Sequence, residues 1–299
     1  MKVTVKFHPI FEFLISLYVF SDKGAHKKMD LGANWVNAIK PVLSDDFLHV
    51  VFNKETRTKL AVIQYYLLSQ KVNENESILQ LLTQIEEEET KNLITPAYEC
   101  TEFKEQIPPD VKDVIPLLIE WYNTYFTTID EKIFNNLRES VQIAKKALKK
   151  KTVSQVVEEL TNGIIPPKES SREIVLIPQY HYSPTVLHDK TVSQRIYFYP
   201  VDAMPNADGS PSILLMRKLR ALTDENRLKI LKYLAKGDRT FSDIQKHIGL
   251  AKSTVHHHLI VLRSAGLLSL VVYESQPDQY RLREGGYTGL EKLLTDFIT

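Results

Sequence analysis

Apolar residues return at steps of three and four through much of the first 160 residues, which is the pattern of helices with one buried face. The clearest case runs from Val111 to Phe126, whose apolar residues all fall on one side of a helix. The same spacing recurs on both sides of this segment. It predicts helices over residues 56–69, 77–93, 111–126, 133–148 and 153–160.

A continuous apolar run from Ile10 to Phe20 lies close to the start of the chain and has the look of a signal peptide. Glu12 interrupts the run, and no cleavage site made of small residues follows it. A buried helix opened by Pro9 is therefore the better interpretation. No other stretch approaches the roughly 20 apolar residues that span a bilayer, so we expect no membrane segment.

The periodicity changes at Pro166 and Pro167, which cannot continue a helix. Residues 173–178 and 192–199 are rich in β-branched and aromatic side chains and are bounded by turn formers. We expect two strands here that pair with each other. The N-terminal part is thus predicted to be a mostly helical domain that carries a β-hairpin.

The last part of the chain is predicted to form short helices followed by a second hairpin. Asp224 and Thr240 are good N-caps, and Gly249 interrupts the chain before another helix begins near Ala251. Two short helices joined by such a turn form a helix-turn-helix, whose second helix enters the major groove of DNA. Val255 and its helical neighbours would form the buried side of that second helix.

The residues after Gly266 complete this predicted domain. Residues 267–273 and 279–282 alternate in polarity around a turn at Pro277, which predicts a β-hairpin of the kind called a wing. A final helix over residues 290–298 carries an apolar stripe that needs a cover. A second copy of the chain is the economical cover, because paired half-sites on DNA require a two-fold dimer.

Charge is distributed unevenly over the 299 residues, although the formal net charge is only +1. Residues 1–212 hold 24 Lys and Arg against 28 Asp and Glu, whereas residues 213–299 hold 14 against 9. The C-terminal part is therefore basic, as a DNA-binding domain should be. Residues 201–212 are polar and rich in turn residues, as a linker is. The expected organisation is an N-terminal domain over 1–200, a linker over 201–212 and a second domain over 213–299.

Glycine and cysteine usage excludes several kinds of chemistry. The N-terminal part has four isolated glycines, so it cannot build the glycine-rich loops that cradle nucleotide phosphates. The single Cys100 excludes a disulfide framework and multi-cysteine metal sites, and it fits a reducing cytoplasm. No local catalytic motif is present. We expect no catalytic residues, no cofactor and no metal.

Three segments of the C-terminal part carry a family resemblance. Residues 219–231 read LRALTDENRLKIL, residues 251–259 read AKSTVHHHL and residues 262–268 read LRSAGLL. Together they resemble the ArsR/SmtB family of winged-helix transcriptional repressors. The resemblance implies a homodimer that binds operator DNA and is released by a metal or another signal. Segments of the N-terminal part resemble an uncharacterised extension of longer ArsR-type regulators: residues 8–14, Trp35 and residues 175–178.

The expected fold is mainly α within the α+β class, with a C-terminal winged helix-turn-helix domain. We expect contacts to base edges or adjacent phosphates from four residues of the second helix: Ser253, Thr254, His256 and His257. Contacts to the DNA backbone are expected from Thr240, Lys246, Lys252 and Arg263. The expected dimer interface comprises Leu214, Leu215, Leu290, Leu293, Leu294 and Phe297. The partners are then double-stranded operator DNA with an inverted repeat, a second copy of the chain, and a small-molecule effector.

Departures from the family pattern argue against metal sensing. The predicted third helix has no cysteine pair, and the last helix has no histidine. His256, His257 and His258 are consecutive, so they point about 100° apart on a helix and cannot converge on one ion. His181, His188 and Asp189 could form a site with one more donor, or they are simply polar loop residues.

Some alternatives stay open at this stage. The aromatic residues of the N-terminal part line an effector pocket or simply belong to the core: Trp35, Tyr65, Tyr66, Trp121, Tyr122 and Tyr125. The N-terminal part could also be an enzyme domain fused to a winged helix that regulates its own gene. A winged helix used only for protein contacts is the third possibility.

Overall fold

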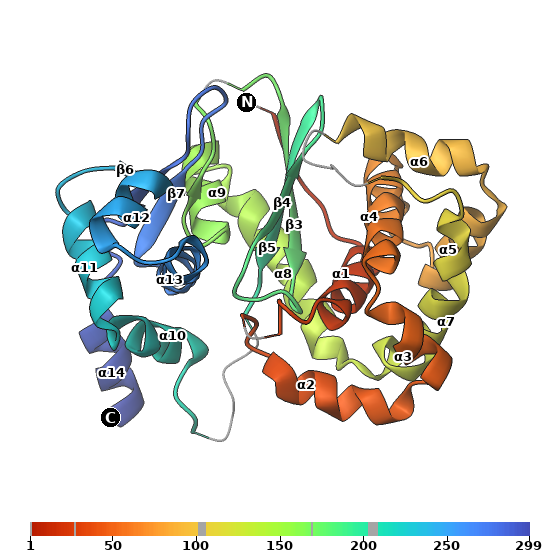
Figure 1. The fold of residues 1–299 in the computed structure, drawn as a ribbon, viewed down its shortest axis with the longest axis horizontal. Helices are drawn as coiled ribbons and strands as arrows, with labels where there is room; N and C mark the ends of the chain where they lie inside the picture. The colour runs from red at the N-terminus through yellow and green to blue at the C-terminus, as the bar shows by residue number, and fades with distance from the viewer. Residues whose placement is uncertain (1, 27, 101–105, 169, 203–208) are drawn as a thin grey trace. The chain divides into compact units, whose positions relative to one another are not determined.

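The computed structural model describes residues 2–26, 28–100, 106–168, 170–202 and 209–299. The described chain divides into two compact units, which Figure 1 shows as ribbons. We call residues 2–143 with 172–201 the N-terminal unit, and residues 144–171 with 202–299 the winged-helix unit. This division differs from the single boundary expected between residues 200 and 213, because residues 144–171 group with the C-terminal part. Of the expected linker, residues 203–208 lie outside the described residues.

Helices make up most of the N-terminal unit, as the periodicity predicts. Its helices are α1 (Pro9–Ser21), α2 (Gly32–Ile39), η1 (Lys40–Val42), α3 (Asp45–Val51), α4 (Lys54–Ser69), α5 (Ile78–Glu87), α6 (Thr90–Glu99), η2 (Val111–Val114), α7 (Ile115–Thr124) and η3 (Phe126–Thr128). Helix α8 (Glu131–Ala147) begins here and ends in the other unit. Among the described residues, no helix combines the length and the apolar character that a membrane crossing demands.

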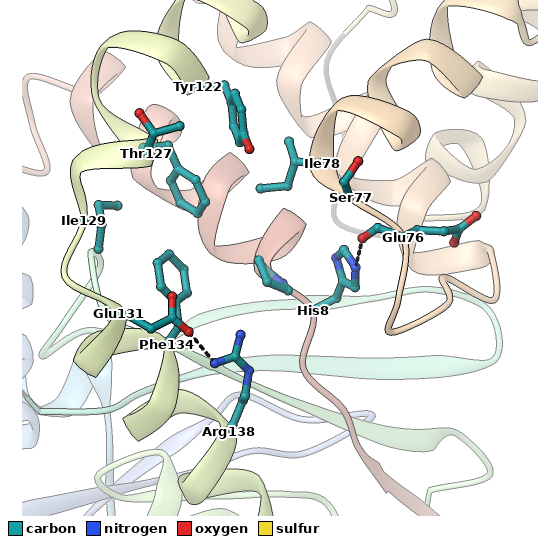
Figure 2. Close-up of a pocket in the computed structure, with 12 residues that line it drawn as sticks. His8, Glu76, Ser77, Ile78, Tyr122, Thr127, Ile129, Glu131, Phe134 and Arg138 are labelled. Atoms are coloured by element: carbon teal, nitrogen blue, oxygen red, sulfur yellow. Dashed lines mark hydrogen bonds and ion pairs between the residues drawn. The ribbon is translucent and has the colours of Figure 1, made fainter.

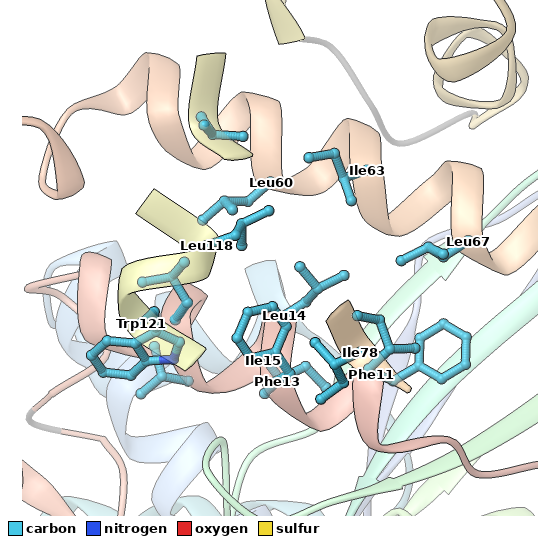
Figure 3. Close-up of a cluster of buried hydrophobic side chains, with 14 of the residues drawn as sticks. Phe11, Phe13, Leu14, Ile15, Leu60, Ile63, Leu67, Ile78, Leu118 and Trp121 are labelled. Carbon is cyan, nitrogen blue, oxygen red and sulfur yellow. The ribbon is translucent and has the colours of Figure 1, made fainter. Parts of the chain in front are cut away.

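Helix α1 forms the centre of the N-terminal unit. Pro9 occupies its first turn, and the Nδ1 atom of His8 accepts a hydrogen bond from the backbone N–H of Ile10 at 3.1 Å. The helix packs against both β3 (Glu173–Gln179) and α4, so it is apolar nearly all round. Figure 3 shows its side chains facing those of α4 and α7. The core members labelled there include Phe11, Phe13, Leu14, Ile15, Leu60, Ile63, Leu118 and Trp121.

The sheet of the N-terminal unit has the strand order β1-β3-β5-β4. The two strands predicted to pair are β3 and β5 (Gln194–Pro200), and they pair in parallel. The prediction that they form a hairpin is therefore wrong. The hairpin partner of β5 is the short strand β4 (Leu187–Lys190), which lies antiparallel to it, while β1 (Val3–Val5) closes the other side of β3.

The winged-helix unit contains the expected helices and wing. Asp224 caps α11 through its side chain, which accepts a hydrogen bond from the N–H of Arg227. The expected wing is present as two antiparallel strands, β7 and β8. The elements are α9 (Val153–Leu160), β2 (Ile164–Ile165), α10 (Ile213–Leu222), α11 (Glu225–Leu234), β6 (Arg239–Thr240), α12 (Phe241–Ile248), α13 (Lys252–Ser264), β7 (Leu268–Val271), β8 (Gln279–Leu282) and α14 (Leu290–Ile298).

Strand β2 completes the wing sheet from far upstream in the chain. The strand order is β2-β7-β8-β6, and β2 pairs in parallel with β7. Gly163, just before β2, has φ +109° and accepts a hydrogen bond from the N–H of Leu270 at 2.6 Å. A Cβ atom at this position would lie 2.6 Å from the carbonyl oxygen of Leu268. The close approach of these two backbones therefore requires glycine.

Candidate nucleic-acid interface

Helices α12 and α13 form the helix-turn-helix. Thr240 opens α12 with a capping box: its hydroxyl oxygen accepts from the N–H of Asp243, and the Asp243 carboxylate accepts from the N–H of Thr240. Gly249 ends α12 at φ +75°, in the left-handed conformation typical of a helix C-cap. The chain then turns at once into α13, which begins at Lys252.

Helix α13 has one buried and one exposed side. Val255, Leu259 and Leu262 are 0–2% exposed and pack into the core of the unit. The opposite side turns five polar side chains of the first two turns to solvent. These exposed residues are Lys252, Ser253, Thr254, His256 and His257. The helix thus presents a polar face of the length that can enter a major groove.

The three consecutive histidines do not act as a group. His258 is buried, and its Nδ1 atom lies 3.9 Å from a carboxylate oxygen of Asp224. Burial lowers the pKa of His258, so the neutral ring is favoured there, while His256 and His257 face solvent. Across the ranges that the structure describes, no cluster of His, Cys, Asp and Glu has the arrangement to hold a metal ion.

The start of α13 lacks a side-chain cap, because Ala251 occupies the N-cap position. Within the described part of the chain, the backbone N–H groups of Lys252 and Ser253 have no hydrogen-bond acceptor. Such free N–H groups at a helix N-terminus bind phosphate oxygens well. Sequence reasoning missed this feature, although an alanine where serine, threonine or aspartate usually stands was the available signal.

Two of the residues expected to contact the DNA backbone are engaged within the chain instead. Arg263 is only 9% exposed, and its guanidinium donates a hydrogen bond to the carbonyl of Thr161 at 3.3 Å. It therefore holds α13 to the end of α9 and is not free for DNA. The hydroxyl of Thr240 is engaged by Asp243 in the capping box. Lys246, by contrast, is exposed on α12.

The wing offers little positive charge to DNA. Arg281 on β8 makes a bidentate ion pair with Asp238, with a shortest N–O distance of 2.6 Å. Hydrogen bonding to Asp238 raises the pKa of Arg281. The tip of the wing is exposed and carries Glu274 and Asp278. The exposed polar side chains of the helix-turn-helix therefore lie on α13 and α12, and the wing adds little positive charge beside them.

The expected dimer residues divide into two groups. Leu215 is 1% exposed and is therefore already covered within a single chain. Leu214 on α10 is 39% exposed and Phe297 on α14 is 46% exposed. Three further residues of α14, all partly buried, continue this apolar face: Leu290, Leu293 and Leu294.

In the N-terminal unit, the loop histidines are separated. His188 and Asp189 lie on β4, whereas His181 is completely buried against Glu12 of α1. Glu12 accepts hydrogen bonds from the N–H groups of Tyr180 and His181 and from Nδ1 of the His181 ring. The hydroxyl of Tyr125 lies 2.6 Å from the other ring nitrogen of His181. Of the three loop candidates, His181 thus belongs to a buried hydrogen-bond network with Glu12 and Tyr125. Nothing in the local sequence around His181 indicates this network.

The remaining N-terminal candidates lie in the core or pack against it. Cys100 is a buried free thiol. Trp121 is fully buried and donates a hydrogen bond from its indole N–H to Ser16 at 2.9 Å. Burial raises the pKa of the Tyr125 hydroxyl, which therefore keeps its proton. Two of the aromatic residues also line cavities: Tyr65 and Tyr122.

The fold and the site define a winged helix-turn-helix domain of the kind that binds DNA in transcriptional regulators. Residues 224–269 match the family model described as "Bacterial regulatory protein, arsR family". This part is an ArsR-family helix-turn-helix domain, within a longer chain that has an extra N-terminal region. Similarity to known regulators covers only the C-terminal part.

Two curated relatives match this part of the chain. The transcriptional repressor SdpR of Bacillus subtilis is 40% identical over 50 residues, which are 17% of this chain and 56% of that protein. The "Probable mercury resistance operon repressor" of Streptomyces lividans is 38% identical over 53 residues, 18% of this chain and 42% of that protein. The chain thus spans about half the length of the curated relatives that it matches.

Solved structures also match a part of the chain. The transcriptional repressor BigR from Xylella fastidiosa is 25% identical, and the match covers 28% of this chain and 85% of that one with a TM-score of 0.23. HlyU from Vibrio cholerae is also 25% identical, with coverages of 29% and 94% and a TM-score of 0.23.

Proposed function

We propose that the chain is a sequence-specific, homodimeric transcriptional repressor that acts on DNA in the cytoplasm. Each copy inserts α13 into the major groove at one half of an inverted repeat, and the N-terminal unit responds to a small-molecule effector. The observation that carries the proposal is the exposed polar face at the start of α13. On this helix four polar residues are exposed, whereas the apolar side is buried. The exposed residues are Ser253, Thr254, His256 and His257.

The charges around α13 support groove binding. Lys252 and Lys246 are exposed, and the uncapped N–H groups of the first turn add a partial positive charge. Serine, threonine and neutral histidine can hydrogen-bond to base edges, whereas lysine mainly contacts phosphate. We therefore assign recognition of the base sequence to the serine, threonine and histidine residues, and sequence-independent affinity to the lysines.

The docking proposal makes a first prediction. A double variant with His256→Ala and His257→Ala is expected to lose about 1–3 kcal/mol of operator binding per lost base contact, and to discriminate less between sequences. Fluorescence anisotropy of the full chain with its own promoter region and with random duplex measures both effects. Lys252→Ala is the comparison, because it should weaken both duplexes alike and reduce the slope of affinity against salt by about one. Unchanged operator affinity in the histidine variant would contradict α13 docking.

We further propose that a second copy covers the apolar face of α14 and Leu214. Ile298 is 75% exposed and Phe297 46% exposed, which is unusual for two adjacent large apolar residues at the end of an amphipathic helix. A two-fold contact here would present two copies of α13 to successive half-sites.

The dimer proposal makes a second prediction. Phe297→Glu should weaken self-association by at least about 100-fold, because a buried phenylalanine is worth roughly 1.5–3 kcal/mol and a two-fold interface loses two of them. Sedimentation equilibrium of the full chain measures the effect. Lys292→Ala on the polar side of α14 is the control and should leave the dimer intact. A wild-type chain that stays monomeric at micromolar concentration would refute this interface.

A further inference from the structure

A cavity of about 370 Å³ lies within the N-terminal unit, where the starts of α1, α5 and α8 come together with the end of α7. Figure 2 shows the side chains that surround it. Its volume is within the range of small-molecule sites. Nothing in the DNA-binding proposal uses it. We call it the α8 cavity, after the helix that supplies Arg138.

The inner wall of the α8 cavity is apolar and partly aromatic. Ile78, Phe126 and Phe134 are 5–7% exposed and line it. The rings of Phe126 and Phe134 lie 5.4 Å apart, edge to face, and Tyr122 stacks beside Phe126 at 6.3 Å. These rings form a rigid surface against which an aromatic ring or a branched alkyl group can pack.

Arg138 supplies a positive charge at the edge of this wall. Its Nη1 atom donates to Glu131 at 2.7 Å and to Asn135 at 3.0 Å. Over the described ranges, its Nη2 and Nε atoms have no hydrogen-bond acceptor. The guanidinium therefore keeps one open edge of the kind that grips a carboxylate with two parallel hydrogen bonds. Arg138 and Glu131 are 50% and 67% exposed, so their ion pair is weak and yields readily to a ligand.

The other polar groups around the cavity are already engaged. His8 lies between the backbone N–H of Ile10 and the carbonyl of Glu76, and burial lowers its pKa, so it adds no competing charge. The Glu76 carboxylate accepts hydrogen bonds from Asn73 and Gln84. The hydroxyl of Tyr122, in contrast, has no hydrogen-bond partner in the described part of the chain and points into the space seen in Figure 2.

We propose that the α8 cavity binds a small monocarboxylate with an aromatic ring. The carboxylate lies against the open edge of Arg138, the ring packs on Phe126 and Phe134, and the Tyr122 hydroxyl bonds a polar substituent on the far side of the ring. A 4-hydroxylated arylacetate satisfies all three requirements. Binding itself is independent of DNA, and only the role of the ligand as an effector rests on the proposed function.

Isothermal titration calorimetry of the full chain, without DNA, tests the site with 4-hydroxyphenylacetate and phenylacetate. We expect saturable binding of both acids, with the hydroxylated acid tighter. Arg138→Gln should weaken binding by about ten- to 100-fold, as expected for a lost hydrogen bond to a charged group. The control is Lys132→Gln, which removes the same charge from an exposed position on the same helix and should leave affinity unchanged.

The neutral analogue 4-hydroxyphenylacetamide keeps the ring and loses the charge, so it should bind at least about tenfold more weakly than the acid. The proposal is overturned if neither acid binds at concentrations up to about 10 mM, if the amide binds as tightly as the acid, or if both variants lose affinity equally. A chain that binds the acid but not its promoter would overturn the repressor proposal and leave this site standing. A chain that binds its promoter but neither acid would overturn this site and leave the repressor proposal standing.

Discussion

Replacing Gly163 with alanine is expected to destabilise the winged-helix unit by about 2–6 kcal/mol, of which roughly 1–3 come from backbone strain and 1–3 from overpacking. The residue has φ +109°, which only glycine adopts without strain. The new Cβ would also lie 2.6 Å from the Leu268 carbonyl oxygen and 3.3 Å from Cα of Ser269. Because both neighbours are backbone atoms of β7, strands β2 and β7 must move apart.

Gly249→Ala is a matched control in the same unit. It shares a positive φ, +75°, but its new Cβ would have no heavy atom within 4 Å. The difference between the two variants in urea unfolding, followed by circular dichroism, isolates the collision with β7. Amide exchange should also accelerate at Leu270 and Val272, whose N–H groups donate to Gly163 and Ile165. Equal destabilisation by the two alanines would show that β2 is not held against β7.

Replacing Glu12 with leucine is expected to destabilise the N-terminal unit by about 3–5 kcal/mol, because each donor that loses its acceptor in a buried site costs about 1–3 kcal/mol. Glu12 and His181 are both 0% exposed. The leucine would leave three buried N–H groups of Tyr180 and His181 without an acceptor. It would also remove the hydrogen bond between Glu12 and the His181 ring, which orients that ring toward the Tyr125 hydroxyl.

Both tryptophans of the chain, Trp35 and Trp121, lie in the N-terminal unit, so tryptophan fluorescence follows its unfolding specifically. Glu12→Gln should be less damaging than the leucine, since its carbonyl oxygen can still accept from His181. Glu88→Gln is the control: Glu88 also accepts three hydrogen bonds, but at the surface, and its loss should change little. A Glu12→Leu variant as stable as wild type would mean that the buried network contributes nothing.

Local signals predicted the winged-helix unit well. Asp224 and Thr240 cap the helices that they were expected to cap, and Gly249 ends α12. The split between buried and exposed residues on α13 also follows its helical period. These features depend on neighbours within a few residues, which a sequence displays directly.

Long-range contacts account for what the sequence could not reveal. Arg263 occupies a helix position that looks suited to DNA, but its partner Thr161 lies 102 residues away. Glu12 was seen only as an interruption of an apolar run, because its partner His181 is 169 residues away. A two-residue strand such as β2 has no periodicity to detect, and the parallel pairing of β3 with β5 depends on the whole sheet.

Because β2 lies far upstream of β7, the wing sheet can form only late in synthesis. A ribosome makes α9 and β2 long before β7, and it completes the N-terminal unit, up to residue 201, in the interval. During that time β2 has no strand to pair with, because Ile164 and Ile165 find their partners only in β7. Domains that emerge from the ribosome first generally fold first. The N-terminal unit can therefore fold before β2 has its partner strand, and the DNA-binding domain becomes complete only when the wing has left the ribosome.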